Sequence, residues 1–513
     1  MRTRRRLAVP ALASTALAAS LALATAPISA AEDTAPDPGT TSTEDAGSPA
    51  EADSNLVIDS RPRTQASLNR RGRVRWLDLG FSVTAAGESV SVWSTRQTYA
   101  DPIRSEVRIG DTAVPLPDSM DQRFDRLAKF LTVKITKDGK RRPAAVLTRG
   151  MCLNSWSSTR IRPDAPARNP YPYGCGAMPY TLGTVMGVQA GHSAMPRLSL
   201  GRLSLDPGRY TAVISVNRAW RDVIGMTDED ATTSTRIRIR PSRGRRGPVY
   251  YYGEYGRDGD AVPTTTNDEP QAAAEAPPEG TPVPDLRATP AWGININRRG
   301  TALRFGATVW NGGESPLVID GFRDDDDHDH MTTYQYFFDG RGDQVGYQQV
   351  GEMHWHAANH QHWHLDDFAR YTLLDSDMKT VVKSSKRSFC LANTDAIDYT
   401  VAGANWRPDG TDLSTACGDR SALAVREVLD SGSGDTYHQY RAGQAFRIGD
   451  LPNGTYYIAT IANPLGNLLE SDTSNNVALR KIKLEIRGGK RRVVVPKVGL
   501  VNERERFRNS GWW

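Results

Sequence analysis

The stretch His354-Trp-His-Ala-Ala-Asn-His-Gln-His-Trp-His-Leu-Asp-Asp-Phe368 holds five of the nine histidines in this chain of 513 residues. The last three histidines alternate strictly with Gln361 and Trp363; they are His360, His362 and His364. Side chains two residues apart in a β-strand lie on the same face of the sheet. The alternation therefore predicts a strand over residues 360–369 whose three imidazoles converge on one side. The flanking apolar residues favour a core position; they are Trp355, Trp363, Leu365 and Phe368.

Three neutral imidazoles on one strand suit a borderline divalent metal, and ligation by nitrogen alone favours copper, zinc or iron over calcium or magnesium. Other interpretations of this stretch stay open. It could be a histidine-rich surface run without a metal, or a structural or storage metal site. A cupin would need a glutamate at a fixed spacing after the histidine pair, which the sequence lacks. A zinc hydrolase would need a general base, which no nearby residue supplies in a recognised setting.

Three later segments extend the pattern. Lys386-Arg-Ser-Phe-Cys-Leu-Ala-Asn-Thr394 follows the histidines, and Asp435-Thr-Tyr437 lies seven residues before Gln444. Glu470-Ser-Asp-Thr-Ser-Asn-Asn476 comes last. Together with Trp355-His356 and the histidine triplet, these segments resemble, in order, the signature of the lysyl oxidase family over about two hundred residues.

The resemblance implies a copper amine oxidase that makes its own organic cofactor. Copper would bind His360, His362 and His364, and the cofactor lysyl tyrosylquinone would form from Lys386 and Tyr437, with Tyr440 as the substitute tyrosine. A quinone would supply the electron sink that ordinary side chains lack. Turnover would be ping-pong, with dioxygen as oxidant. The catalytic base is not identified; the candidates are Asp366, Asp367 and His438.

The resemblance also implies a structural calcium site, which hard oxygen ligands on a tight turn would suit. Its ligands would be Asp285, the Leu286 carbonyl, Glu470, Asp472, Asn475 and Asn476. Two features depart from the family pattern. One residue is inserted between His356 and His360, and the acidic run Asp324-Asp-Asp-Asp-His-Asp-His330 has no counterpart. This run could capture copper or a cationic amine, but a solvated loop is the interpretation we favour.

Length and composition indicate an exported protein of more than one domain. Met1-Arg-Thr-Arg-Arg-Arg6 and the apolar run that follows predict a signal peptide over residues 1–30, with Sec and Tat export both open. No later stretch could span a bilayer. Four cysteines in two local pairs suit an oxidising compartment and predict the disulfides Cys152–Cys175 and Cys390–Cys417. A zinc site made of all four is the alternative, although no C-x-x-C spacing occurs.

The composition changes along the chain predict an all-β protein with two β-sandwich-like domains. Residues 31–55 should be disordered and acidic. Short alternating runs such as 74–79, 89–93 and 210–216 predict a sandwich over residues 56–243. Residues 244–283 should be a linker, residues 284–488 the catalytic domain, and residues 489–513 a basic tail. In the expected catalytic domain, strands are predicted over residues 302–310, 456–461 and 477–486.

The two domains resemble each other in sequence. Leu205-Asp-Pro-Gly-Arg-Tyr210 parallels Leu451-Pro-Asn-Gly-Thr-Tyr456, and the cysteine pairs fall at similar positions. We therefore expect residues 56–243 to be a degenerate, non-catalytic copy. Thr148 occupies the position that corresponds to Lys386, and Gly191 the one that corresponds to Tyr437.

These features predict a secreted, copper-dependent amine oxidase acting on lysine-containing peptides or small primary amines. The alternatives are an exported copper-storage protein without quinone chemistry, and a wall-binding structural protein. The net charge of +5 is small for this length. It does not indicate a nucleic-acid partner and is compatible with contact between the first domain and a polyanionic cell wall.

Overall fold

The computed structural model describes residues 54–69, 73–74, 77–201, 203–241, 267–323, 329–355, 361–407, 413–441 and 443–503. Several predictions fall outside these residues: the signal peptide, nearly all of the acidic segment, the first part of the linker, residues 324–328 of the acidic run, and His356 and His360.

Residues 54–241 form three sheets. The first has the order β1 (Val57–Asp59), β3 (Ser82–Ala85), β11 (His192–Ala194), β9 (Ser158–Arg160). The second has the order β10 (Gly183–Val188), β4 (Val90–Thr95), β5 (Arg104–Ile109), β6 (Thr112–Pro115). The third has the order β2 (Arg63–Ser67), β13 (Thr232–Arg240), β12 (Gly208–Val216), β7 (Leu127–Lys137), β8 (Ala145–Met151).

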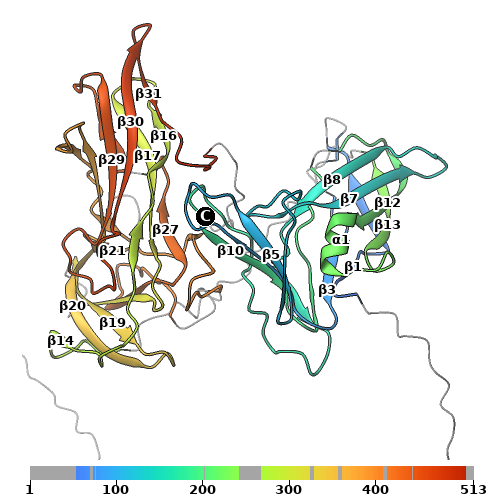
Figure 1. The fold of residues 1–513 in the computed structure, drawn as a ribbon, viewed down its shortest axis with the longest axis horizontal. Coiled ribbons are helices and arrows are strands. Elements are labelled where there is room, and N and C mark those ends of the chain that lie inside the picture. The colour runs from blue at the N-terminus through green and yellow to red at the C-terminus, as the bar shows by residue number, and fades with distance from the viewer. Residues whose placement is uncertain are drawn as a thin grey trace, which may run out of the picture. The chain divides into compact units, whose positions relative to one another are not determined.

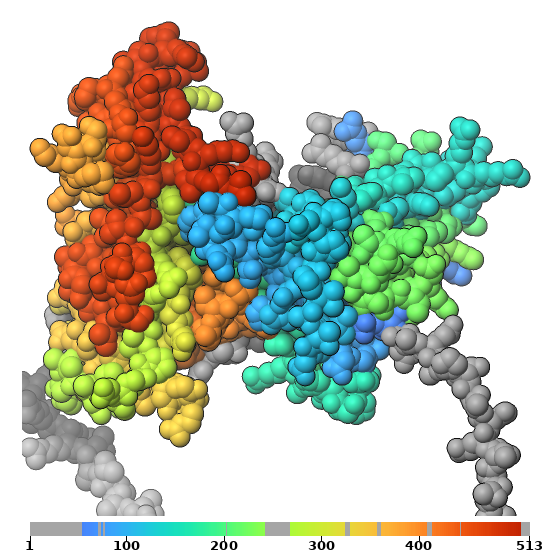
Figure 2. Space-filling model, viewed as in Figure 1, coloured from blue at the N-terminus to red at the C-terminus, as the bar shows by residue number. Residues whose placement is uncertain are grey.

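Alternating apolar residues explain why these segments are strands. In β12, Tyr210, Ala212, Ile214 and Val216 are buried, whereas the residues between them are more exposed. The β7–β8 hairpin ends in a tip of exposed residues, which projects from its sheet in Figure 1 and lies at the surface in Figure 2. One short helix, α1 (Arg218–Ile224), occurs in the described part of the chain. The predicted all-β fold is therefore confirmed, and none of the described helical residues forms a helix that could cross a membrane.

Residues 267–503 form three further sheets. One has the order β24 (Ser388–Phe389), β21 (Trp363–Asp366), β20 (Gln344–Trp355), β19 (His330–Phe338), β18 (Leu317–Phe322), β26 (Ala424–Leu429), with β14 (Ala274–Glu275) on β20. Another has the order β15 (Leu286–Ala288), β17 (Ala302–Asn311), β27 (Ser433–Tyr437), β25 (Asp395–Ala396), with β16 (Trp292–Ile296) and β28 (Ala445–Arg447) on β17. The third has the order β23 (Thr380–Lys383), β22 (Ala369–Leu374), β29 (Gly454–Ala462), β30 (Val477–Arg487), β31 (Lys490–Val494). Its strands β29, β30 and β31 lie side by side in Figure 1.

One hydrophobic core receives side chains from all three of these sheets. Trp363 of β21, Phe305 of β17 and Ile458 of β29 belong to it and are fully buried. Burying a side chain of this class contributes about 1.5–3 kcal/mol relative to leaving it in water. This core fixes the strands that carry the histidines and the lysine and tyrosine segments.

The strands differ in detail from the prediction. Residues 302–310, 456–461 and 477–486 lie within β17, β29 and β30 as expected. The expected strand over 360–369 is wrong, because β21 begins at Trp363 and a turn with Asp367 at φ 52° separates it from β22. Of the expected strand over 74–79, the described residues 77–79 are not in a strand, and Val74 makes isolated bridges to Leu68 and Leu203. Strand β14 lies in the expected linker and β31 in the expected tail, so ordered sheet extends beyond both boundaries.

Local geometry supports the internal duplication. The Tyr210 hydroxyl donates to the Asp206 carbonyl at 2.8 Å, and the Tyr456 hydroxyl donates to the Pro452 carbonyl at 2.9 Å, in both cases four residues upstream. Lys129, within β7, and Asp367, between β21 and β22, both have a positive φ, of 50° and 52°. The tyrosine hydrogen bond and a residue of positive φ thus recur in both halves.

Hydrogen bonds join the two halves within the compact unit Asp53–Trp513. The Leu182 and Gly183 amides both donate to the Ile397 carbonyl, at 2.6 and 3.1 Å. The Thr181 hydroxyl donates to the Ala396 carbonyl at 3.0 Å. The first half therefore contacts strand β25 and the residue after it, which lie within the loop closed by the Cys390–Cys417 disulfide.

Candidate metal and cofactor site

The histidine stretch is held by pairing between β20 and β21. His354 lies opposite His364, and Trp355 lies opposite Trp363. Trp363 faces the core, so the alternation of the strand turns His364 to the other face. His362 lies just before the strand, next to Gln361 at φ 54°. The sheet thus presents two of the three predicted imidazoles together, although only one of them belongs to a strand.

The two described imidazoles are adjacent. Their ring centroids are 4.7 Å apart, and His364 is 3% exposed. Metal–nitrogen bonds of about 2.0–2.1 Å allow two rings at this separation to bind one ion. The Nδ1 atom of His364 also lies 3.3 Å from the Ser388 hydroxyl. The donor chemistry and ring spacing therefore fit a copper ion on this face.

Lys386 and Tyr437 lie together although they are 51 positions apart in the sequence. The Lys386 Nζ atom is 4.0 Å from the centroid of the Tyr437 ring and 4.6 Å from that of Phe389. The amine donates to the Ser388 carbonyl at 3.0 Å, and the Tyr437 hydroxyl donates to the Cys390 carbonyl at 3.1 Å. Ser388 thus contacts both the lysine amine and His364.

Burial changes the ionisation of this pair. It lowers the pKa of Lys386 to about 8, an effect opposed by the negative charge of Asp435 and reinforced by Arg441. Burial raises the pKa of the Tyr437 phenol well above its ordinary value, and Asp435 adds to this effect. The site therefore favours a neutral phenol and makes a neutral amine accessible near physiological pH.

Sequence reasoning missed two buried carboxyl groups of this site. Asp435 is 4% exposed and Glu427 is fully buried, and burial raises the pKa of both well above the ordinary range. The Glu427 carboxylate accepts from the Leu391 amide at 2.9 Å. A signal for Asp435 was present, since it lies two residues before Tyr437 and hence on the same strand face.

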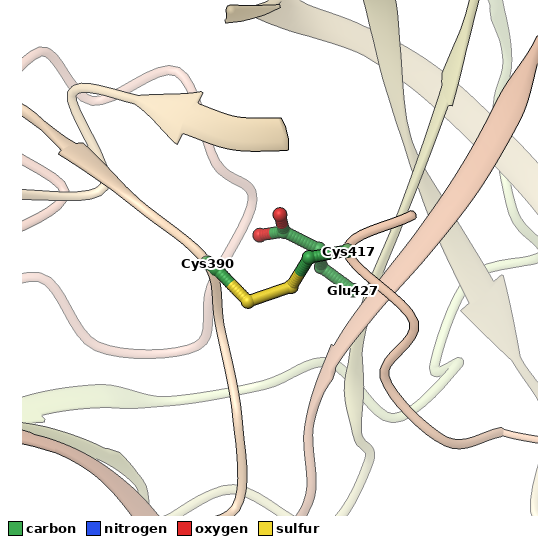
Figure 3. A group of neighbouring side chains, drawn as sticks. All are labelled: Cys390, Cys417 and Glu427. Atoms are coloured by element: carbon green, nitrogen blue, oxygen red, sulfur yellow. A yellow bond between two sulfur atoms is a disulfide. The ribbon is translucent and has the colours of Figure 1, made fainter. Parts of the chain in front are cut away.

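Both predicted disulfides, Cys152–Cys175 and Cys390–Cys417, are formed. Figure 3 shows the Glu427 carboxyl group beside the second of them. Because the sulfur atoms are bonded to each other, they are not thiolate ligands, and this group does not hold a metal. The alternative of a zinc site made of all four cysteines is excluded.

The candidate bases have other contacts. The Asp366 carboxylate lies 2.8 Å from Nδ1 of His354, and the Asp367 carboxylate accepts from Arg370 at 3.2 Å. The His438 ring stacks on Tyr440, and burial, followed by the charge of Arg441, lowers its pKa. The described contacts of these three side chains do not include Lys386 or Tyr437. Tyr440, the substitute tyrosine, is 71% exposed.

The six predicted calcium ligands come together at the start and end of the second half. Glu470 accepts from the Leu286 amide at 2.9 Å and from the Asn476 side chain at 2.8 Å. The Asn475 side chain donates to Asp285 at 2.9 Å and to Asp472 at 3.0 Å. The side-chain oxygens of Asn475 and Asn476 are buried without a hydrogen-bond donor. Oxygen atoms in this state fit a hard cation such as calcium.

A separate hollow of about 540 Å³ lies in the first half. It is lined by three arginines and four further residues, namely Arg209, Arg238, Arg240, Pro207, Gly208, Ile239 and Pro241. None of these belongs to the histidine, lysine or tyrosine segments. The hollow is therefore not part of the candidate site.

The protein thus combines an all-β fold with paired imidazoles beside a partly buried amine and phenol. Residues 331–494 match the family model described as Lysyl oxidase. This part of the chain is therefore similar to the lysyl oxidase family. The matched range ends at Val494, the last residue of β31.

Curated relatives include the protein-lysine 6-oxidases of Bos taurus, Sus scrofa and Gallus gallus. Their identities to this chain are 32% over 180 residues, 33% over 134 and 35% over 124, respectively. The alignments cover 34%, 26% and 24% of this chain and 38%, 46% and 26% of the relatives. The chain therefore spans less than half the length of each of these relatives.

Proposed function

We propose that the protein is a secreted copper amine oxidase that deaminates primary amines, either peptidyl lysine or small amines. A primary amine, dioxygen and water would give an aldehyde, ammonia and hydrogen peroxide. The carbon bearing the amine is oxidised by two electrons, and dioxygen is reduced by the same two. The names of the relatives support lysine as the substrate class.

The observation that carries this proposal is the placement of the Lys386 amine 4.0 Å from the Tyr437 ring centre, with Ser388 linking the amine to His364. A copper-storage protein needs the imidazoles but has no use for an amine held against a phenol. We therefore favour the self-made cofactor lysyl tyrosylquinone over storage.

The roles of the chain's own residues follow from this placement. His362 and His364, with His360, would hold copper, which when bound supplies the redox chemistry that oxidises the Tyr437 phenol. Lys386 would provide a neutral amine directed at that ring. Asp435, which interacts with both groups, is placed to take up a proton from the amine or the phenol.

The test is amine-dependent peroxide release by the copper-loaded protein, combined with quinone staining and mass measurement of the peptides that contain Lys386 and Tyr437. We expect one cross-linked peptide. Two separate, unmodified peptides from a protein that holds copper and releases no peroxide would favour storage.

The lowered pKa of Lys386 gives a pH prediction. In metal-free protein labelled at lysine Cε, the Lys386 resonance should titrate at about pH 8. Asp435→Asn should move this pKa further down, because the opposing negative charge is lost. The unfolded chain binds more protons than the folded one between about pH 8 and the ordinary lysine value of about 10.4, so Lys386 makes stability rise with pH in that window. A midpoint at the ordinary value would show that the amine is solvated.

We also propose that Asp285, Leu286 and the 470–476 turn bind calcium. Adding calcium to chelator-treated protein should raise its thermal stability, because an ion that binds only the folded state at 100 times its Kd contributes about 2.7 kcal/mol. Asp472→Ala should remove this response. Asp377→Asn, in an exposed turn between β22 and β23, is the matched control and should keep it. An unchanged melting temperature in all three proteins would contradict the site.

For the first half we propose a non-catalytic role. Leu127 pairs with Met151 as Leu365 pairs with Phe389, so the register of β7 and β8 matches that of β21 and β24. In this register Arg126 corresponds to His364, and Thr148 corresponds to Lys386. The equivalent site in the first half therefore has neither the imidazole nor the amine.

A further inference from the structure

A row of three imidazoles crosses the sheet next to the candidate copper site. His330 of β19 lies opposite His354 of β20, which in turn lies opposite His364 of β21. On the other face the corresponding row is Met331, Met353 and Leu365, all buried in the core. Since directly opposed residues share a face, the three histidines line the same side of the sheet.

Exposure falls along this row. His330 is exposed, the side chain of His354 is 49% exposed, and His364 is 3% exposed. The His330 and His354 ring centroids are 6.4 Å apart. A metal ion bound to both rings at about 2.0–2.1 Å requires only a small rotation of exposed side chains.

Two carboxylates complete the surroundings of His354. Asp366 lies 2.8 Å from its Nδ1, and Glu352 lies 3.8 Å from its Nε2. Histidines that bind metals commonly donate one ring N–H to a carboxylate, which fixes the ring and directs the other nitrogen at the ion. Asp366 is thus a positioning residue for His354, and Glu352 is within reach of the same ion.

We infer that His330, His354 and Glu352 form an outer copper site, one strand away from His364, which captures the ion before it enters the buried site. Imidazole and carboxylate donors together favour copper(II) over the other common divalent ions. Capture at the exposed end raises the local copper concentration beside His364. The role in loading rests on the proposed function of the buried histidines, whereas binding at the outer site does not.

The experiment titrates metal-free, full-length protein with copper(II) against a chromophoric chelator. His330→Asn/His354→Asn should bind about one equivalent less than the wild type. Asp366→Asn should weaken the outer site by about 10–100-fold, as expected for loss of a residue that orients a ligand. Thr332→Ala is the matched control, because it alters the same sheet face without removing an imidazole or a carboxylate, and it should bind as the wild type does.

A second measurement separates the two sites. His362→Ala/His364→Ala should retain one copper with the electron paramagnetic resonance signature of nitrogen ligation, which reports the outer site even if the protein is not an amine oxidase. Equal stoichiometry in the wild type and the His330/His354 variant would overturn the outer site. A lost equivalent with an unchanged rate of loading of the buried site would overturn its role in capture.

Discussion

Lys386→Ala should reduce amine-dependent peroxide release to the background of the assay while copper stays bound. The amine that would complete the cofactor is lost, but the imidazoles of His362 and His364 are untouched. Folding should survive, because the change removes a buried polar group together with its desolvation cost. Copper content, quinone staining and peroxide release, measured on one preparation, check the three parts of this expectation.

Two further variants sharpen the result. Lys386→Arg should also be inactive, because a guanidinium stays charged and cannot supply a neutral nucleophile. Lys383→Ala, on the exposed side of β23, removes a lysine three residues away and should keep full activity. Peroxide release that persists in Lys386→Ala would falsify the assignment of the cofactor lysine.

The double variant His362→Ala/His364→Ala should lose both the tightly held copper and all amine oxidation. The two rings lie within 4.7 Å of each other, so a single ion loses two ligands at once. The measurement is metal content after dialysis against a chelator, followed by peroxide release.

The matched control for the histidines is Gln361→Gly. This substitution changes the residue between His360 and His362 but removes no imidazole. Glycine readily adopts the positive φ of 54° at that position. The variant should keep copper and activity. Peroxide release by the double alanine variant after dialysis would contradict copper binding by His362 and His364.

Local patterns in the sequence predicted much of the fold. Strands with one buried face, such as β12, β29 and β30, are predictable from the alternation of apolar and polar residues. The cysteine spacing predicted both disulfides. The prediction of one strand holding all three histidines was wrong, because alternation does not reveal the positive φ at Gln361 or the turn at Asp367. The backbone geometry at these two residues interrupts a sequence pattern that is otherwise typical of a strand.

The site was less accessible from sequence. Family resemblance named Lys386 and Tyr437, but their proximity depends on β27 pairing with β17 and on the loop between β23 and β24. Pairing between distant strands leaves no local signal. The same holds for Ser388 and Glu427, whose importance arises only from what surrounds them, and for the row formed by His330, His354 and His364.

The hydrogen bond from Lys386 to the Ser388 carbonyl has a consequence for the proposed formation of the cofactor. The amine is not left as an unpaired donor among the aromatic rings, because a backbone oxygen accepts its hydrogen bond. Under the proposed function the chain would therefore fold with this donor satisfied before copper binds, and cofactor formation would require this hydrogen bond to break.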